Sequence, residues 1–198
     1  HMIRVGDLRF AYPDGTEALR GISFEIGRGE SVAIIGANGA GKSTLLQHLN
    51  GYLKPSGGQI HIGGIPANPE TVRQIRRSVG IVFQDPDDQL FMPTVFEDVA
   101  FGLLNHGVSP AETMRLAMAA LERVGMAHLK DRPPHKLSAG EKRAVAIATV
   151  LALSPDVLVM DEPSSNLDPR GRRRLISLLA TFEHTKIIAS HDLEMVVE

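Results

Sequence analysis

The chain has 198 residues, of which 43% are hydrophobic and 22% are charged, as is usual for a folded globular protein. Its formal net charge of −2 gives no reason to expect a nucleic-acid partner, and the absence of cysteine excludes disulfide bonds and thiolate metal sites. No apolar run approaches the roughly 18 residues that a membrane span needs, and no signal peptide is expected ahead of the fold.

The first third of the chain predicts strands joined by short turns. Apolar and polar residues alternate over 3–12, which predicts a half-buried strand, and a turn leads to a second strand over 22–26. The continuous apolar run at 31–36 is typical of a buried strand. Residues 43–51 have helical spacing and end on Asn50-Gly51, a C-cap signal, and a short strand is expected within 56–64.

The remainder of the chain alternates strands with helices. Buried-strand runs occupy 78–84, 156–162 and 185–191, and helices are expected over 111–124 and 140–153. A β-rich start followed by this alternation predicts an α/β fold, with a parallel sheet in the core and an antiparallel patch at the N-terminus.

A phosphate-binding loop is predicted between the third strand and the first helix. Residues 36–43, GANGAGKS, match the pattern G-x-x-x-x-G-K-[ST]. Glycines let successive backbone N–H groups converge on one anion, and the helix N-terminus adds partial positive charge. Lys42 supplies a mobile charge for the β- and γ-phosphates, and the Ser43 hydroxyl can bind Mg²⁺, which prefers oxygen ligands. Motif and context together favour a nucleotide site over a glycine-rich surface turn.

Two acidic residues end another buried strand, in the run VLVMDE. Asp161 is expected to hold Mg²⁺, directly or through water. Glu162 is expected to polarise a water for attack on the γ-phosphate. Alone, the pair would be an ordinary acidic turn, but the phosphate loop favours the catalytic interpretation.

The run HKLSAGEKRAVAIA, His135 to Ala148, contains a helix start. Ser138 can cap the helix, Glu141 follows three residues later, and an apolar-rich run comes next, which together form a capping box. A capping box explains why a helix begins there and is silent about function.

Five motifs in a fixed order resemble the nucleotide-binding domain of an ABC transporter. They are the phosphate loop, FQD at 83–85, LSAGE at 137–141, VMDEPSSNLD at 159–168 and SHD at 190–192. The resemblance covers the chain from Ile3 to Glu198. It implies a P-loop NTPase of RecA-like fold, with a core lobe over 2–84 and 155–198 and an inserted helical lobe over 85–154. It also implies ATP and Mg²⁺ as cofactors.

The resemblance gives roles to individual residues. Tyr12 matches the aromatic residue that stacks on adenine, and Asp168 matches the D-loop aspartate at a dimer seam. Gln84 matches the Q-loop glutamine, which contacts Mg²⁺ and faces a transmembrane partner. The implied catalytic residues are Lys42, Gln84, Glu162 and His191, the last being the switch histidine. The implied Mg²⁺ ligands are Ser43, Gln84 and Asp161. The implied nucleotide-binding residues are Tyr12, Gly36, Asn38, Gly39, Ala40, Gly41, Lys42, Ser43, Thr44, Ser138 and Gly140.

The LSAGE segment matches the signature motif, whose commonest form is L-S-G-G-Q. In the family this motif covers the ATP held by a second chain, so the resemblance implies a head-to-tail dimer, either of identical chains or of two related ones. Ser138 and Gly140 would face that nucleotide. Ala139 replaces a glycine, and because alanine disfavours positive φ, an ordinary backbone is expected there. Glu141 replaces a glutamine, and our hypothesis is that it folds back to cap its own helix.

Two longer strings indicate a branch of the family. Residues 83–102 and 184–196 resemble the ATPase subunits of energy-coupling-factor and cobalt or nickel importers. This implies import of cobalt or nickel through partner membrane subunits, at the cytoplasmic face of the membrane. A vitamin importer and a soluble ABC ATPase that moves no solute are alternatives. The family domain normally continues beyond the switch histidine, so its C-terminal end is expected to be missing here.

The segment after the Q-loop is interpreted as facing the membrane partner. The acidic run Asp85 to Asp88 is expected to be a solvated loop and not a metal site. Four apolar residues would either offer a surface to a coupling helix of the partner or pack between the two lobes. These four are Phe83, Leu90, Phe91 and Met92.

Overall fold

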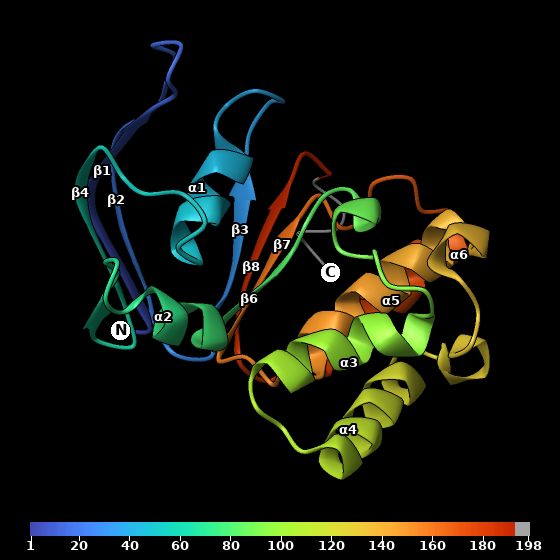
Figure 1. The fold of residues 1–198 in the computed structure, drawn as a ribbon. Coiled ribbons are helices and arrows are strands. Elements are labelled where there is room, and N and C mark those ends of the chain that lie inside the picture. The colour runs from blue at the N-terminus through green and yellow to red at the C-terminus, as the bar shows by residue number, and fades with distance from the viewer. Residues whose placement is uncertain (193–198) are drawn as a thin grey trace. The chain divides into compact units, whose positions relative to one another are not determined.

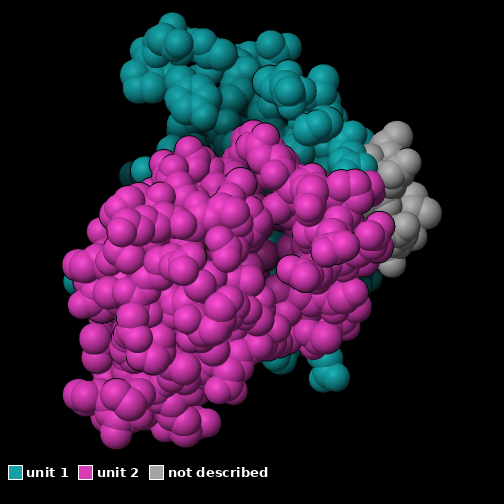
Figure 2. All heavy atoms as spheres, turned by 90° about the vertical axis from the view of Figure 1, so that its right-hand side faces the viewer, with its two compact units in different colours: residues 1–81, 155–162, 183–197 teal, residues 82–154, 163–182, 198 magenta. Residues whose placement is uncertain are grey.

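The computed structural model describes residues 1–192 and divides into two compact units, coloured separately in Figure 2. Unit 1 comprises His1–Ile81, Pro155–Glu162 and the described residues from Glu183 onward, and unit 2 comprises Val82–Ser154 and Pro163–Phe182. The division expected from the sequence placed residues 163–182 with the core lobe, whereas in the structure they cluster with the helical unit. Residues 193–198 of the expected core lobe lie outside the described residues, and these include the last four residues of the string 184–196.

Unit 1 begins with an antiparallel sheet in the strand order β2-β1-β4-β5 (Figure 1). The strands are β1 (Ile3–Ala11), β2 (Glu17–Ile26), β4 (Gly57–Ile62) and β5 (Ile65–Pro66). Ile3 and Val5 alternate and are buried as expected, whereas an irregularity between Val5 and Leu8 shifts the alternation by one residue, so that Leu8 is the next buried one. β2 begins five residues before the strand expected over 22–26, because the chain pairs with β1 as far as Glu17.

The second sheet of unit 1 has the order β3-β8-β7-β6 and is built from the continuous apolar runs. Its strands are β3 (Ser31–Ile35), β6 (Val79–Val82), β7 (Val157–Asp161) and β8 (Thr185–Ser190). β8 pairs in parallel with both β3 and β7, and its last residues lie beside Ile35 and Asp161. The carboxyl ends of these three strands therefore meet at one edge of the sheet.

One hydrophobic core joins the two sheets of unit 1 through a helix. Helix α1 (Lys42–Leu49) contributes Leu45, Leu46 and Leu49 to this core, and the short helix α2 (Val72–Ser78) contributes Ile75. Residues from both sheets complete it. The position of α1, directly after the phosphate loop, is thus fixed by apolar packing on its buried face.

Unit 2 is helical. It contains α3 (Val95–Asn105), α4 (Pro110–Arg123), α5 (Ala139–Leu151) and α6 (Pro169–Ala180), with the single turns η1 (Pro86–Asp88), η2 (Ala127–Leu129) and η3 (Pro134–Lys136). Helices α3, α4 and α5 pack on one another around a core of small and branched residues. Each of the four long helices starts at a side-chain cap, which is Thr94, Ser109, Ser138 or Asp168 in turn.

The expected fold class is confirmed: a parallel core sheet, an antiparallel N-terminal sheet and an inserted helical segment. Helices α2, α3 and α6 are not among the expected elements, although Thr94 and Glu97 form a capping box and Asp168-Pro169 is a helix-start signal. Within residues 1–192, no helix combines the length and the apolar character that crossing a bilayer requires.

The core of unit 2 gives a stability prediction. Leu121 on α4 has no exposed surface, whereas 62% of Met114 on the same helix is exposed. Leu121→Ala should lower the free energy of unfolding by about 2–5 kcal/mol, because it removes buried methyl groups and leaves a cavity. Met114→Ala is the matched control and should change it by less than about 0.5 kcal/mol. Urea denaturation followed by circular dichroism measures both, and equal effects would contradict the assigned core.

Candidate active site

The phosphate loop links β3 to α1 and requires glycine at its last position. Gly41 has φ +93, and a Cβ atom there would lie 2.8 Å from the carbonyl oxygen of Ala18. Gly41 is also the N-cap of α1, so no side chain caps the helix, and the first turn contains no acidic residue. The first N–H groups of a helix have no partners within it. The loop therefore presents a concentration of unsatisfied donors with no negative charge of its own, which suits an anion.

Lys42, Glu162 and His191 form a contiguous cluster at the edge where β3, β7 and β8 end. Lys42 Nζ donates to the carbonyl oxygens of Gly36 and Ala37, the second at 2.9 Å, and lies 3.9 Å from Glu162 Oε1. Glu162 Oε2 lies 2.9 Å from His191 Nδ1. The carboxylate thus bridges the lysine of the phosphate loop and the histidine that follows β8. The side chains of Lys42 and Glu162 are nearly buried, while 61% of the His191 side chain is exposed.

The backbone at Glu162 is unusual. Its φ of +45 lies in the left-handed region, which disfavours side chains other than glycine and costs about 1–3 kcal/mol. The N–H of Glu162 still donates to Ala189 at 2.8 Å, so the residue extends the pairing of β7 with β8. Sheet pairing on one side and the His191 contact on the other hold this conformation. Asp161, the preceding residue, ends β7 and is 7% exposed.

The donor set at this edge fits a Mg²⁺–nucleotide complex. The Ser43 hydroxyl stands in the first turn of α1, and the Asp161 carboxylate stands at the end of β7. Both are oxygen donors, which Mg²⁺ prefers, and Mg²⁺ usually completes its shell with phosphate oxygens and water. Within residues 1–192 no group of three or more His, Asp or Glu side chains is arranged to hold a metal ion.

Tyr12 lies just after β1 and contacts the helix that follows the phosphate loop. Its hydroxyl lies 2.6 Å from Thr44 Oγ1, and its ring meets Phe10 edge to face. The hydroxyl of Thr44 is thereby engaged, and its carbonyl oxygen lies 2.7 Å from His48 Nδ1. Burial lowers the pKa of His48, although the Thr44 carbonyl opposes this shift. The structure thus places Tyr12 in the same unit as the phosphate loop and shows Thr44 as a contact between them.

The capping box at the start of α5 is confirmed. Ser138 N donates to Glu141 Oε1 at 2.9 Å, and Glu141 N donates to Ser138 Oγ at 3.2 Å. Our hypothesis that Glu141 folds back onto its own helix is therefore confirmed. The hydrogen bond from the Ser138 backbone lowers the pKa of Glu141. Ala139 is not among the residues with positive φ, which confirms the expected ordinary backbone.

Gly140 is not required by its own chain. A Cβ atom there would meet only Leu167 Cδ2, at 3.9 Å, which is ordinary contact, and its φ is not positive. Glycine inside a helix costs about 0.5–1 kcal/mol relative to alanine. Because no contact within the chain requires glycine at this position, a close approach by a molecule outside the chain would explain it.

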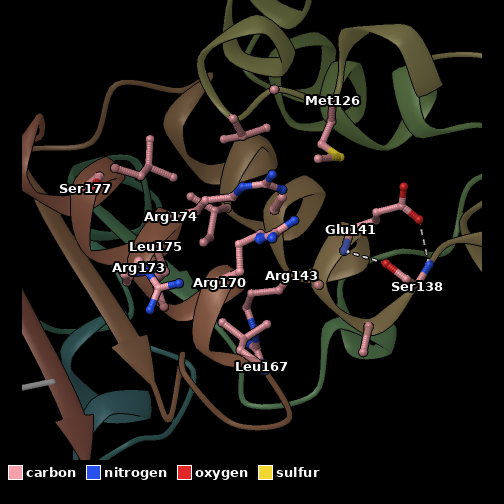
Figure 3. Close-up of a pocket in the computed structure, with 18 of the residues that line it drawn as sticks. Met126, Ser138, Glu141, Arg143, Leu167, Arg170, Arg173, Arg174, Leu175 and Ser177 are labelled. Atoms are coloured by element: carbon pink, nitrogen blue, oxygen red, sulfur yellow. Dashed lines mark hydrogen bonds between the residues drawn. The ribbon is translucent and has the colours of Figure 1, made fainter. Parts of the chain in front are cut away.

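The signature segment and the D-loop line one pocket of about 1040 Å³ in unit 2 (Figure 3). Ser138 and Gly140 come from the start of α5, and Asp168 comes from the start of α6. Asp168 Oδ1 accepts a 2.6 Å hydrogen bond from Gly171 N, so this aspartate caps its own helix. Five arginines that we did not expect line this pocket; Figure 3 labels Arg143, Arg170, Arg173 and Arg174, and the fifth is Arg123. The run RGRRR at 170–174 is the sequence signal that could have indicated Arg170, Arg173 and Arg174.

The structure therefore brings some of the expected site residues together and not others. Unit 1 holds the phosphate loop with Tyr12, Asp161, Glu162 and His191. Unit 2 holds Gln84, Ser138, Gly140 and Asp168. Gln84 follows β6, and its carbonyl oxygen accepts a hydrogen bond from Arg143. Sequence reasoning did not identify Arg143, although a charged residue in the apolar run of α5 is a signal for a buried polar contact.

Comparison with known proteins identifies the family. The ABC transporter family model matches residues 19–165.

The chain belongs to the ABC transporter family.

It is the ATP-binding cassette of that family, an ATPase that powers transport through partner subunits. A putative ABC transporter ATP-binding protein of Geobacter sulfurreducens is 64% identical over 198 residues, which are all of this chain and 80% of the relative. The energy-coupling factor transporter ATP-binding protein EcfA of Methanothermobacter thermautotrophicus is 50% identical over 98% of this chain and 64% of its own length.

Solved structures agree with the fold. The structure of cbiO1 from Clostridium perfringens, part of the ABC transporter complex cbiONQ, matches with a TM-score of 0.87 and 46% identity over 99% of this chain and 80% of its own. The dimeric ATP-binding cassette MJ0796, bound to ADP and Pi in a post-hydrolysis state, matches with a TM-score of 0.89 and 27% identity over 98% and 90% of the two chains.

Two of the apolar residues near the Q-loop, Leu90 and Phe91, differ in their surroundings. Leu90 is 8% exposed and packs in the core of unit 2, so it offers no surface to a partner. Phe91 is 62% exposed, and its ring meets Phe101 edge to face at 5.0 Å. The carboxylate of Asp98 accepts hydrogen bonds from the N–H groups of Phe91 and Met92, which fixes this exposed turn. Burial raises the pKa of Asp98 despite these bonds.

The capping box gives a prediction that depends on pH. Glu141→Ala should lower the free energy of unfolding by about 0.5–1.5 kcal/mol at pH 7, because the hydrogen bond that Ser138 N donates to its carboxylate is lost. Glu141→Gln should cost much less, because glutamine also forms capping boxes. The folded-state pKa of Glu141 is lowered, so its charge-dependent stabilisation is complete above the ordinary value of 4.5 and is lost as the pH falls through the lowered pKa.

Thermal unfolding between pH 3 and pH 7 measures this effect. The wild-type chain should lose more stability than Glu141→Gln as the solution is acidified below the ordinary glutamate pKa of 4.5. Glu112→Gln serves for comparison, because the pKa of Glu112 is lowered by an ion pair with Arg115 on the surface of α4 and not by a helix cap. Identical pH profiles for wild type and Glu141→Gln would contradict the role of the ionised cap.

Proposed function

We propose that this cassette hydrolyses Mg²⁺–ATP to power a cobalt or nickel importer. The hydrolytic part rests on the cluster of Lys42, Glu162 and His191 beside a phosphate loop. The choice of cobalt or nickel rests on the resemblance of residues 83–102 and 184–196 to importers of these ions, and the likeness to cbiO1 supports a transporter-complex ATPase. The likeness to EcfA supports an energy-coupling ATPase of a vitamin importer as a second candidate.

The phosphate loop would bind the nucleotide through backbone N–H groups. Lys42 would exchange its contacts with the Gly36 and Ala37 carbonyl oxygens for the β- and γ-phosphates. Ser43 and Asp161 would hold Mg²⁺ together with Gln84. Bound Mg²⁺ neutralises charge on the phosphate oxygens. Tyr12 would contact the adenine, since it lies against the first turn of α1.

Glu162 would act as the base that orients or deprotonates the attacking water. Its carboxylate is nearly buried, and its left-handed backbone is fixed by sheet pairing. With a proton on Nδ1, His191 donates to Glu162 Oε2 and fixes the rotation of the carboxylate. The oxygen of the water would form the new bond to the γ-phosphorus while the bond to ADP breaks, and Glu162 would take the proton. Fixed charges positioned before the reaction account for most of such catalysis.

A second copy of the chain would complete the site. The proposal is supported by the dimeric cassette MJ0796, by the uncapped phosphate loop in unit 1 and by Ser138 and Gly140 in unit 2. In a head-to-tail pair, the signature segment of one copy would cover the nucleotide of the other. The helix N-terminus of α5 and the absence of a side chain at Gly140 both suit a close phosphate.

The exposed aromatic turn on unit 2 would bind the membrane subunit. Phe91 and Phe101 form an apolar pair that is largely exposed, and Leu104 on the same helix α3 is 50% exposed. Exposed apolar patches of this kind mark partner sites. The complex with the membrane subunits would place the chain at the cytoplasmic face of the membrane.

The catalytic role of Glu162 is tested by Glu162→Gln. The change keeps the size of the side chain and removes the base, so ATP hydrolysis should fall by at least about 100-fold, the usual contribution of general base catalysis. ATP binding should be retained and should favour the dimer, because the cleavage that reopens it is blocked. Phosphate release and size-exclusion chromatography with ATP measure the two effects. Hydrolysis at the wild-type rate would show that another group is the base.

The docking surface is tested by Phe91→Ala. Because the ring is exposed, the chain should fold normally, and binding to the membrane subunits should weaken by on the order of 2 kcal/mol, the size typical of an interface hot spot. Tyr52→Ala is the control, since Tyr52 is an equally exposed aromatic residue in unit 1. Copurification from cells that express the chain with its membrane subunits is the measurement. Equal recovery of both variants would exclude this surface as the docking site.

The transported solute is tested in the same cells. Cells that express the complete transporter should accumulate radioactive cobalt or nickel, and cells that carry Glu162→Gln should not. Accumulation of a vitamin instead of a metal ion would favour the second candidate.

A further inference from the structure

Two successive carbonyl oxygens of the Q-loop are held by one buried arginine. Arg143 Nη1 donates to Phe83 O at 2.8 Å, and Arg143 Nη2 donates to Gln84 O at 2.6 Å. Arg143 lies on α5 and is only 3% exposed. A guanidinium presents its donors in a rigid plane, so it fixes the orientation of both peptide groups. The ammonium group of a lysine has no such plane and cannot hold both in the same way.

The rest of this loop is attached to the same helix. Lys142, the neighbour of Arg143, donates to Asp87 Oδ1 at 2.8 Å. Within the loop, Phe83 N donates to Gln89 Oε1 at 2.9 Å, and the Asp85 side chain caps η1. The segment 83–89 is therefore an internally bonded unit that is joined to α5 at Phe83, Gln84 and Asp87.

Helix α5 carries the signature segment at its first turn. Ser138 is the N-cap, and Arg143 follows five residues later, which is about one and a half helical turns. An α-helix of this length is stiff over that distance. A displacement of the signature segment therefore moves the carbonyl oxygens of Phe83 and Gln84. Conversely, a displacement of Gln84 moves the signature segment.

We propose that Arg143 is a positioning residue that sets the orientation of Gln84 and links it to the signature segment. This inference rests on the proposed role of Gln84 in contacting Mg²⁺ and the membrane subunit. The link is a direct, doubly hydrogen-bonded contact within one unit of the protein. The start of α5 would contact the nucleotide bound to a second copy, so the Arg143 contact couples that nucleotide to the Q-loop. Such coupling is reciprocal.

The test is Arg143→Lys in the whole protein, which keeps the charge and removes the planar fork. We expect the rate of ATP hydrolysis to fall about 10- to 100-fold, because displacing a group in the active site by up to about 1 Å has effects of this size. The Mg²⁺ concentration for half-maximal activity should rise, while ATP binding in the absence of Mg²⁺ should stay at the wild-type level. Amide hydrogen exchange should increase over 83–89 and not over α4. Arg115→Lys, on the exposed side of α4, is the control and should behave as wild type.

A double-mutant cycle separates positioning from a general structural role. If Arg143 acts through Gln84, then Gln84→Ala combined with Arg143→Lys should be no slower than Gln84→Ala alone. If the double variant instead shows the product of the rate reductions of the two single variants, the proposal is overturned. If Gln84→Ala has wild-type hydrolysis and Mg²⁺ dependence, the proposed role of Gln84 is wrong. If Gln84→Ala is impaired while Arg143→Lys is not, only the positioning inference is wrong.

Lys142→Met provides a second variant if Arg143→Lys does not fold. The ion pair of Lys142 with Asp87 is partly exposed and contributes little to folding, so this chain should remain native. It should show faster hydrogen exchange over 86–89 and a Mg²⁺ requirement that is raised about two- to threefold, a smaller effect than for the buried arginine. An unchanged exchange pattern and an unchanged Mg²⁺ requirement would overturn the link between α5 and the loop.

Discussion

The candidate catalytic cluster depends on the parallel pairing of β8 with β3 and β7. This pairing brings Ile35, Asp161 and Ser190 to one edge of the sheet, so the residues that follow them emerge together. Glu162 follows the phosphate loop by more than a hundred residues and precedes His191 by 29, yet its carboxylate contacts both Lys42 and His191. Parallel strands all end at the same side, which is why α/β proteins build their sites at that edge.

The same edge contains two features that folding alone would disfavour. Glu162 has a left-handed backbone, and its nearly buried carboxylate is placed between a lysine and a histidine. A buried charge is tolerated when partners are held in good geometry. Here the partners are held by strand ends and by the loop before α1. Unfavourable local conformations that surrounding structure enforces are typical of functional sites, where they fix a group before the reaction begins.

The first turns of α5 in unit 2 make several different contacts. The capping box satisfies two N–H groups at the start of the helix, those of Ser138 and Glu141, and Gly140 keeps the surface beside them free of a side chain. Lys142 and Arg143 then reach from the same turns to the loop that contains Gln84. A short stretch of helix therefore combines capping, a surface suited to a phosphate and a connection to the Q-loop. Glu141 is committed to capping, so its negative charge is held by its own helix.

The sequence by itself determined the elements whose signals are local. The phosphate loop needs glycine at fixed positions, the buried strands are continuous apolar runs, and the capping box at Ser138 is complete within four residues. Even so, helix α3 was not expected, although Thr94 and Glu97 form an equivalent box that is complete within four residues. The resemblance to the ABC family supplied what spacing alone does not, namely which residues act together.

Only the tertiary structure decided the contacts between distant segments. No pattern in the sequence shows that Glu162 lies between Lys42 and His191, or that Leu90 is buried while its neighbour Phe91 is exposed. The bond from Arg143 to the Q-loop carbonyls spans about sixty residues and uses backbone atoms, which every residue has. Local patterns report the periodicity of one segment, whereas these contacts depend on which strand edges and helix faces pack together. That packing follows from burial of apolar surface over whole units, and no short motif records it.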